Sequence, residues 1–382
     1  MEMRRLLSGG LFALLAVGIA TVAVAADPRP IGVFDSGIGG LTVLERLMAH
    51  PGLRGERYTY LGDQANMPYG NYAAAGKSAY LRELAVKDAL FLVSDGYFTD
   101  GAADVPRGAK EPAKVVVIAC NTATAYGRDA ADAVFKCAGA RQRVIGVINA
   151  GVRSMLRQVG AARTDGPIAV GVLATPGTIA SGAYPRTVER ECARQGVKAS
   201  VTVFSQGCPG LADAIELGTA DADRIARDSL RSLVAQYRKS GCAAPLKAVI
   251  LGCTHYPFLM TTLERTRAEL GMDFLFVDPA VDTAEECYRA LKDEGRLAER
   301  DPDATQVDVF VSVPSAALPA ECRAADGTLA RDYKYGRDAG RDEVTTKFVP
   351  LANGTVDQAS LSRLTKLLPL TRAALRKSGD RK

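Results

Sequence analysis

Histidine is scarce: the chain has two among its 382 residues, and it has no tryptophan. A metal centre built on histidine is therefore not expected, and the eight cysteines show no CxxC spacing of the kind that binds zinc. With 37 glycines and 18 prolines, the chain is neither collagen-like nor of low complexity. The net charge of +5 is too small and too scattered to indicate a nucleic-acid partner.

Long apolar stretches are also scarce, and the only notable one lies at the start of the chain. Residues 1–26 begin with two arginines, continue into an apolar run over 11–24 and end in small residues, as secretory signal peptides do. A membrane anchor is the alternative, but the run of about 14 residues falls short of the roughly 20 that span a bilayer. We predict cleavage near Ala25 or Ala26 and a periplasmic or secreted mature protein without a membrane segment.

The rest of the chain has the composition of a globular protein. It is 47% hydrophobic and 24% charged, and its length favours two domains, or three. Four segments repeat one pattern, in which a short apolar strand is followed by small polar residues and then by helical periodicity: 31–47, 114–134, 168–184 and 247–266. Continuous β-branched runs are typical of parallel strands buried on both faces, so the alternation predicts an α/β fold.

These four segments form two similar pairs. IGVFDSG in the first resembles VGVLATPG in the third, and VVVIACNTATA in the second resembles AVILGCTHYPF in the fourth. We therefore expect two α/β domains of similar plan that face each other across a cleft. Ligands of open α/β sheets bind beyond the carboxyl ends of the strands, where the small polar residues of all four segments lie.

Two cysteines hold equivalent positions in this repeat. Cys120 and Cys253 each follow a buried strand and precede a helical pattern, with Asn121 and Thr122 as expected helix caps after the first. The positive end of a helix dipole and nearby donors would bring the thiol pKa toward working pH. A lone cysteine here would more often be a small buried hydrophobe. Two thiols facing one cleft instead suit inversion of a carbon stereocentre, which needs an acid–base group on each side.

The chain resembles glutamate racemase, of the cofactor-independent aspartate/glutamate racemase superfamily, over about residues 30–290. The resemblance rests on FDSGIGGLTVL (34–44), the GD and PYG of GDQANMPYG (62–70), ACNTATA (119–125), CPGLADAIELG (208–218) and LGCTHYP (251–257). It implies a cofactor-independent enzyme that interconverts L- and D-glutamate by α-proton transfer between two thiols. A single G-x-G-G run does not match the spaced dinucleotide fingerprint.

The resemblance also implies roles for individual residues. Cys120 and Cys253 would be the two acid–base thiols, assisted by Asp35 and His255, and Glu216 would be an acidic group near the second thiol. Substrate would be bound by Ser36, Pro68, Tyr69, Gly70, Asn121, Thr122 and Thr254. Two of these assignments have a simpler alternative: Asp35 and Ser36 could cap the following helix, and Tyr69 could be part of a turn.

The fold implied is two similar doubly wound parallel-sheet domains related by a pseudo-twofold axis, with the active site between them. The first domain would comprise residues 27–147 and 278–382, and the second 148–277. The partner would be the small acidic substrate, and the oligomeric state stays open, with a homodimer among the arrangements allowed.

Several features depart from the family pattern. The loop 64–67 lacks the basic residue that the family usually has, the loop 96–113 is longer than usual, and residues from about 300 onward exceed the common length. His255 favours glutamate over aspartate as substrate. The alternatives are an aspartate or hydantoin racemase, a small-diacid isomerase, or an exported protein that only binds an acidic amino acid. In an exported protein we expect Cys120 and Cys253 to be free and some of the other six cysteines to be paired.

Overall fold

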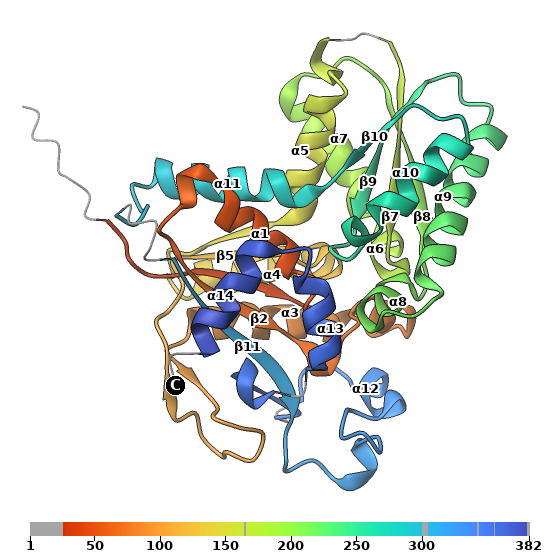
Figure 1. Ribbon diagram of the computed structural model, residues 1–382. Helices are drawn as coiled ribbons and strands as arrows, with labels where there is room; N and C mark the ends of the chain where they lie inside the picture. The colour runs from red at the N-terminus through yellow and green to blue at the C-terminus, as the bar shows by residue number, and fades with distance from the viewer. Residues whose placement is uncertain (1–25, 164–165, 300–304, 342–343, 355, 380–382) are drawn as a thin grey trace, which may run out of the picture.

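The computed structural model describes residues 26–163, 166–299, 305–341, 344–354 and 356–379 (Figure 1). The apolar run of the predicted signal peptide lies outside these residues. Over the described ranges, the strands form two main sheets and one small hairpin. No helix there is long and apolar enough to cross a membrane.

Sheet A has the strand order β12-β11-β2-β1-β5-β6. Its strands are β1 (Ile31–Asp35), β2 (Arg57–Gly62), β5 (Val115–Ile118), β6 (Arg143–Gly146), β11 (Gln306–Pro314) and β12 (Thr346–Pro350). All neighbours pair in parallel except β12, which runs antiparallel to β11. Every residue of β1 and β5 is buried, which accounts for their uninterrupted apolar sequences.

Sheet C has the strand order β10-β9-β7-β8, with all neighbours parallel. Its strands are β7 (Ile168–Ala174), β8 (Val201–Gly207), β9 (Leu246–Gly252) and β10 (Leu275–Val277). Counted along the chain, both sheets contain the order second, first, third, fourth: β2-β1-β5-β6 in sheet A and β8-β7-β9-β10 in sheet C. The sequence repeat therefore corresponds to a repeat of topology, in which β1 matches β7 and β5 matches β9. The predicted α/β fold with two related parallel sheets is confirmed.

Helices cover the faces of both sheets (Figure 1). They are α1 (Leu41–Ala49), α2 (Gly70–Ala74), α3 (Ser78–Val93), α4 (Asn121–Cys137), α5 (Val147–Gln158), α6 (Pro176–Ala180), α7 (Ala183–Gln195), α8 (Leu211–Leu217), α9 (Ala222–Lys239), α10 (Met260–Glu269), α11 (Pro279–Asp293), α12 (Arg331–Gly336), α13 (Gln358–Thr365) and α14 (Pro369–Gly379). Residues alternate between the two faces of sheet A: Val115 and Val117 belong to one core cluster, while Val116 and Ile118 belong to another with residues of α3 and α4.

Helices α5 and α11 carry the chain between the two sheets. The strands of sheet A come from 31–146 and 306–350, and those of sheet C from 168–277. Helix α5 leads out of sheet A and α11 leads back, and the two helices pack against each other. The domain boundaries near 147 and 278 stay a prediction, but the change of sheet occurs across these two helices.

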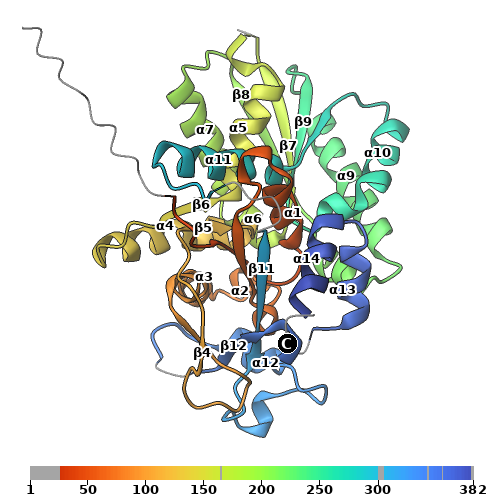
Figure 2. The same cartoon turned by 60° about the vertical axis from the view of Figure 1, so that its left-hand side comes forward.

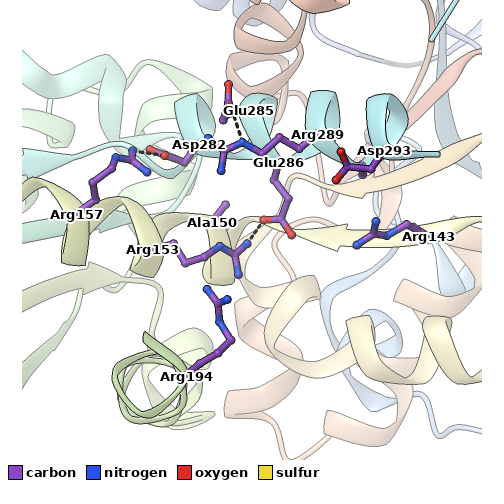
Figure 3. A pocket seen from close by; sticks show the side chains of 11 residues that line it. Arg143, Ala150, Arg153, Arg157, Arg194, Asp282, Glu285, Glu286, Arg289 and Asp293 are labelled. Atoms are coloured by element: carbon purple, nitrogen blue, oxygen red, sulfur yellow. Dashed lines mark hydrogen bonds and ion pairs between the residues drawn. The ribbon is translucent and has the colours of Figure 1, made fainter. Parts of the chain in front are cut away.

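The junction between α5, α7 and α11 is a charged cleft (Figure 3). Arg153 of α5 pairs with Glu286 of α11 and, at 3.2 Å, with Glu191 of α7. Arg157 of α5 pairs with Asp282 of α11. Ion pairs thus connect the two helices that join the sheets.

The C-terminal part of the chain adds to sheet A. The apolar stretch 307–313 lies in β11, and the two helices α13 and α14 follow, with Pro369 at the start of the second. The loop 96–113 contains a short antiparallel pairing of β3 (Gly96–Tyr97) with β4 (Gly108–Ala109) that the sequence had not indicated. In both views the C-terminal elements, drawn in blue, lie against the first half of the chain (Figures 1 and 2).

The cysteines correct one expectation. Cys120 and Cys253 are free thiols, as predicted, but so are five of the other six: Cys137, Cys192, Cys208, Cys242 and Cys287. These five lie within the described ranges and form no disulfide there, although we expected some of the six to be paired. Cys208 and Cys287 are buried in the hydrophobic core, where a thiol packs as a small apolar group.

Candidate active site

Cys120 lies at the carboxyl end of β5 and begins α4. Its sulfur accepts a hydrogen bond from the backbone N–H of Ala123 at 3.4 Å, so the thiol itself caps the helix. The expectation that Asn121 and Thr122 are the caps is wrong, because these two residues form the first turn of α4. Their side chains are consequently available for contacts with the other half of the molecule.

Cys253 lies at the equivalent end of β9, but the segment after it differs. A short 3-10 helix, η4 (Tyr256–Leu259), comes next, and α10 begins only at Met260. The dipole of a long helix therefore does not start at this thiol as it does at Cys120. Cys253 instead has His255 beside it, whose Nδ1 lies 3.7 Å from the sulfur.

Asp35 links the surroundings of the two cysteines. Its carboxylate accepts a hydrogen bond from Ser36 Oγ at 3.1 Å and one from Thr254 Oγ1 at 2.9 Å. Ser36 Oγ in turn lies 3.7 Å from the sulfur of Cys120, and Thr254 directly follows Cys253 in the chain. The alternative in which Asp35 and Ser36 cap a helix is wrong, because α1 begins after Gly40.

Glu216 and His255 form a buried pair on the Cys253 side. His255 Nε2 lies 2.7 Å from Glu216 Oε2, and the other carboxylate oxygen accepts a hydrogen bond from Gln64 Nε2 at 2.7 Å. Glu216 comes from α8, beyond sheet C, whereas Gln64 comes from the loop that follows β2 in sheet A. The structure thus brings Glu216 beside the second cysteine, where the resemblance implied it.

Burial controls the protonation of Cys120. Its side chain is 6% exposed, and this burial, with a contribution from the nearby Asp35 charge, raises the thiol pKa far above the ordinary value. The Ala123 N–H and the Ser36 hydroxyl lower the pKa only in part, and the Cys253 charge raises it further, which shows that the two sulfurs are electrostatic neighbours. The expectation that the helix dipole brings this pKa toward neutrality is therefore wrong, because desolvation outweighs the dipole.

The two assisting groups also have raised pKa values, for different reasons. Burial raises the pKa of Asp35, against the opposing effects of the His255 charge and the hydrogen bonds from Thr254 and Ser36. Burial by itself would lower the pKa of His255, but hydrogen bonds to Cys253 and Glu216, and the charges of both, raise it well above its ordinary value. This raised pKa favours the protonated form of His255, whose ring lies between the sulfur of Cys253 and the carboxylate of Glu216.

The glycines of the GIGG run bring the backbone close to this pair. A Cβ atom on Gly39 would lie 2.2 Å from Cε1 of the His255 ring, a distance that no side chain tolerates. Only glycine therefore lets the loop after β1 pack on His255. This close approach explains why the run after β1 needs glycine, although it does not match a nucleotide-binding loop.

Asn121 and Thr122 contact the second half of the molecule. Asn121 Oδ1 accepts a hydrogen bond from Tyr184 OH at 2.7 Å, and Thr122 Oγ1 lies 3.0 Å from Thr175 Oγ1 and 2.9 Å from Thr178 Oγ1. Sequence reasoning did not select these three partners. A signal for Thr175 was present, because it follows β7 as Ser36 follows β1 in the repeat.

The Pro68–Gly70 turn is held by contacts with both halves of the molecule. The Tyr69 side chain is buried, and its hydroxyl lies 2.5 Å from Asp63 Oδ2 and 2.6 Å from Asp88 Oδ2. Tyr69 is therefore more than a turn residue, and it anchors this loop to α3. Gly70 lies against the second half, where a Cβ atom would come within 3.2 Å of the Thr175 side chain.

Access to the two thiols is closed in this arrangement. Cys120 is 6% exposed and Cys253 is 8% exposed, and direct side-chain hydrogen bonds such as Thr122 to Thr178 join the halves around them. Both sulfurs are therefore largely shielded from solvent. Among the described residues, no group of three or more His, Cys, Asp or Glu side chains could hold a metal ion.

Comparison with known proteins identifies the family. The model of the Asp/Glu/hydantoin racemase family matches residues 99–287. The glutamate racemase of Pseudomonas paraeruginosa is 34% identical over 276 residues, which cover 72% of this chain and 86% of that protein. The chain belongs to the glutamate racemase family.

Solved structures of this family share the fold. Glutamate racemase from Francisella tularensis, in complex with D-glutamate, matches with a TM-score of 0.55 and 29% identity, over 77% of this chain and 90% of that one. The RacE1 isoform from Bacillus anthracis matches with a TM-score of 0.55 and 28% identity, over 74% and 88% of the two chains. About a quarter of the present chain therefore lies outside the part shared with these family members.

Proposed function

We propose that this protein is a cofactor-independent glutamate racemase that moves the α-proton between two thiols. The observation that carries the proposal is the placement of Cys120 and Cys253 at matching strand ends of two sheets with the same strand order. Similarity to relatives that are named glutamate racemases supports glutamate as the substrate.

In the proposed reaction, the sulfur on one side of the site acts as a base and the sulfur on the other side acts as an acid. A thiolate on one side takes the α-proton from glutamate, and the thiol on the other side delivers a proton to the opposite face of the same carbon. The product is the other enantiomer, and each sulfur ends in the protonation state from which the reverse reaction starts. Positioned acid–base groups of this kind each contribute about 10²–10⁴-fold in rate.

The electrostatics of the two sides suit this division. The raised pKa of Cys120, mainly caused by burial, keeps that sulfur protonated, as a proton donor requires. His255 places a positive charge 3.7 Å from the sulfur of Cys253, where it would pair with a thiolate. Ser36, Asn121, Thr122, Thr254 and the Pro68–Gly70 turn would bind the carboxylate and amino groups of the substrate, with Asp35 and Glu216 assisting proton transfer.

Deuterium incorporation tests the proposal directly. L-Glutamate is incubated with the enzyme in deuterated water without any added cofactor, and D-glutamate carrying α-deuterium is the expected product. Formation of D-glutamate without α-deuterium, or only after addition of pyridoxal phosphate, contradicts the two-thiol mechanism. Aspartate is run in parallel, and a higher kcat/KM for aspartate would overturn the assignment of glutamate.

The two cysteines are tested by substitution. Cys120→Ala and Cys253→Ala should each lower kcat for racemisation by about 10²–10⁴-fold, because each removes one of the two acid–base groups. Cys208→Ala is the matched control: this thiol also follows a strand, β8, but it is buried in the core, so turnover per folded molecule should change little. Full turnover in either active-site variant would rule out the mechanism.

We also propose that the chain is exported through its N-terminal segment and acts in the periplasm or outside the cell, where it would supply or consume D-amino acids near the cell-wall peptidoglycan. The charged start, apolar run and small residues of 1–26 support this. Mass spectrometry of the protein from a periplasmic or culture-medium fraction should give a chain that begins near residue 26 or 27. An uncleaved chain recovered from the cytoplasm would contradict export.

A further inference from the structure

The C-terminal segment, residues 305–379, reaches the loop that follows β2. Strand β11 lies beside β2 in parallel register, and Ser312 Oγ accepts a hydrogen bond from the backbone N–H of Ala65 at 2.9 Å. Helix α12 lies at the same end of the molecule as β12 (Figure 2). The loop 63–70, which ends in the Pro68–Gly70 turn, is therefore contacted by a part of the chain that begins more than two hundred residues later.

Arg337, just after α12, is the centre of this contact. Its side chain is buried, with 7% exposed, and its guanidinium donates to Asn66 Oδ1 at 2.5 Å, to Tyr72 OH at 2.7 Å and to Thr345 Oγ1 at 2.8 Å. The same guanidinium lies 4.8 Å from the ring centroid of Tyr80. A planar cation with several donors in fixed directions holds such a set of partners in one geometry.

The contact passes from Asn66 into the rest of the loop. Asn66 Nδ2 donates to both carboxylate oxygens of Asp63 at 2.9 Å, and Tyr69 OH lies between Asp63 and Asp88. The Arg337 guanidinium therefore holds Asn66 directly, Asp63 through Asn66, and Tyr69 through Asp63. These are buried polar groups, for which the loss of one partner leaves others unsatisfied.

The loop has no positive charge of its own. Residues 63–70 read DQANMPYG, without Lys or Arg, and burial raises the pKa of the adjacent Asp88 well above its ordinary value, with the Asp63 charge adding to the effect. The C-terminal segment provides cations: Arg337 at Asn66, and Lys334, whose ammonium donates to the backbone carbonyl of Met67.

The same loop reaches the proton-transfer residues. Gln64 donates to Glu216, which pairs with His255 beside Cys253, and Gly70 lies against Thr175 in the second half. The C-terminal segment also approaches Glu216 from the other side, because Arg363 of α13 donates to its backbone carbonyl. In Figure 1, α13 lies beside α8, which carries Glu216.

We propose that Arg337, with Lys334, is a positioning residue for the loop 63–70, so that the C-terminal segment is a working part of the active site. Arg337 does not touch the thiols and acts through Asn66, Asp63 and Tyr69. The proposal rests on the proposed function, since the loop is placed in substrate binding there. It also requires, independently of any activity, that Arg337 keep the loop in its observed conformation.

The test uses Arg337→Met, Arg337→Lys and the control Arg341→Met in the full-length mature protein. Arg341 lies in the same segment and its substitution changes the charge equally, but its side chain is 73% exposed. Loss of Arg337 should raise KM for both glutamate enantiomers at least tenfold with a smaller change in kcat. The reason is that a smaller fraction of the molecules then has the loop 63–70 in the conformation that binds substrate. Arg337→Lys should recover part of the loss, and Arg341→Met should match the parent.

Hydrogen exchange of the peptide covering 63–72, measured without substrate, separates this inference from the function. Faster exchange in Arg337→Met than in Arg341→Met supports positioning even if the parent protein does not racemise glutamate, an outcome that would defeat only the proposed function. Unchanged exchange in the loop, or a lower Tm with KM unaltered, would overturn the inference. If Arg337→Met fails to fold, Arg337→Lys and Lys334→Met take its place. Each should show faster hydrogen exchange in the 63–72 peptide, to a smaller degree. Unchanged exchange in both variants would also overturn the inference.

Discussion

Each titratable residue of the site takes its properties from its immediate surroundings. Cys120 and Cys208 both follow parallel strands, and burial is the main cause of a raised thiol pKa in both, to about 11 for Cys208. Only Cys120 has an aspartate and a serine from another strand end beside it. The residue type and its position after a strand therefore do not distinguish the proposed proton carrier from a core thiol. What differs is the identity of the neighbours, which are Asp35 and Ser36 for Cys120 and Ser229 and Tyr256 for Cys208.

The His255–Glu216 pair should make stability depend on pH in a defined direction. The pKa of His255 is higher in the folded protein than its unfolded value of about 6.5, so the pair stabilises fully below that pH and loses its effect as pH rises through the folded pKa. Glu216→Gln should lower the free energy of unfolding by about 3 kcal/mol near pH 6, because it leaves a buried imidazolium unpaired.

The measurement is urea unfolding of the parent and Glu216→Gln between about pH 6 and 10, a window that spans the unfolded histidine pKa and the alkaline range. The difference between the two proteins should shrink as pH rises, because His255 of the parent then loses its proton and with it the stabilising effect of the pair. A difference that stays constant, or that grows with pH, would show that His255 is not cationic in the folded state.

At the scale of elements, the junction of α5 and α11 decides how the two sheets are joined. Arg153 connects α5 to Glu286 of α11, which is half-buried (Figure 3), and to Glu191 of α7, which is buried. These two helices are the connections through which the chain passes from one sheet to the other and back. The ion pairs therefore lie between the helices that connect the two sheets.

Arg153→Met should lower the free energy of unfolding by about 1–2 kcal/mol at low ionic strength, because two partly buried carboxylates each lose a partner. The loss should be smaller in about 1 M salt, where the screening length falls to about 3 Å. Denaturant titrations at the two salt concentrations measure both effects. Arg128→Met is the comparison, since Arg128 pairs only with the exposed neighbour Asp129 and should change stability little. A loss independent of salt would assign the effect to packing instead.

At the scale of the whole molecule, one buried ion pair ties distant parts of the chain together. Lys114, with no exposed side-chain surface, donates to Glu56 Oε2 at 2.6 Å, to the carbonyl of Asp27 at 2.7 Å and to the carbonyl of Arg296 at 2.9 Å. The segment before β1, the residue before β2 and the turn after α11 therefore meet at the ammonium group of Lys114, just before β5.

Lys114→Met should therefore destabilise the protein by about 3–5 kcal/mol, because Glu56 is left buried without its partner. The double variant Lys114→Met with Glu56→Leu should recover much of this loss, since the uncompensated charge is gone. Equilibrium unfolding of the parent, both single variants and the double variant forms a complete cycle. If the double variant is as unstable as the sum of the single ones, the two groups are not coupled and the ion pair is not the cause.

Much of the architecture could be predicted from the amino-acid order. Continuous β-branched strands such as 115–118 indicate burial on both faces, and the repeated segments indicate two sheets with matching strand ends. The positions of Cys120 and Cys253 at those ends follow from the same local pattern. These features are local or periodic, so they can be read without knowing which distant groups come together.

Contacts between distant residues could not be read in this way. The capping of α4 by Cys120 itself, the inward orientation of Tyr69 and the contact of Arg337 with Asn66 all depend on which surfaces the folded chain brings together. The thiol pKa of Cys120 is the clearest case, because the helix dipole is a local property whereas desolvation is set by every segment packed around the sulfur. The amino-acid order is sufficient to predict the two strand–cysteine units and the α/β fold. The tertiary structure alone decided their charges, partners and accessibility, because burial and electrostatics sum over the whole fold.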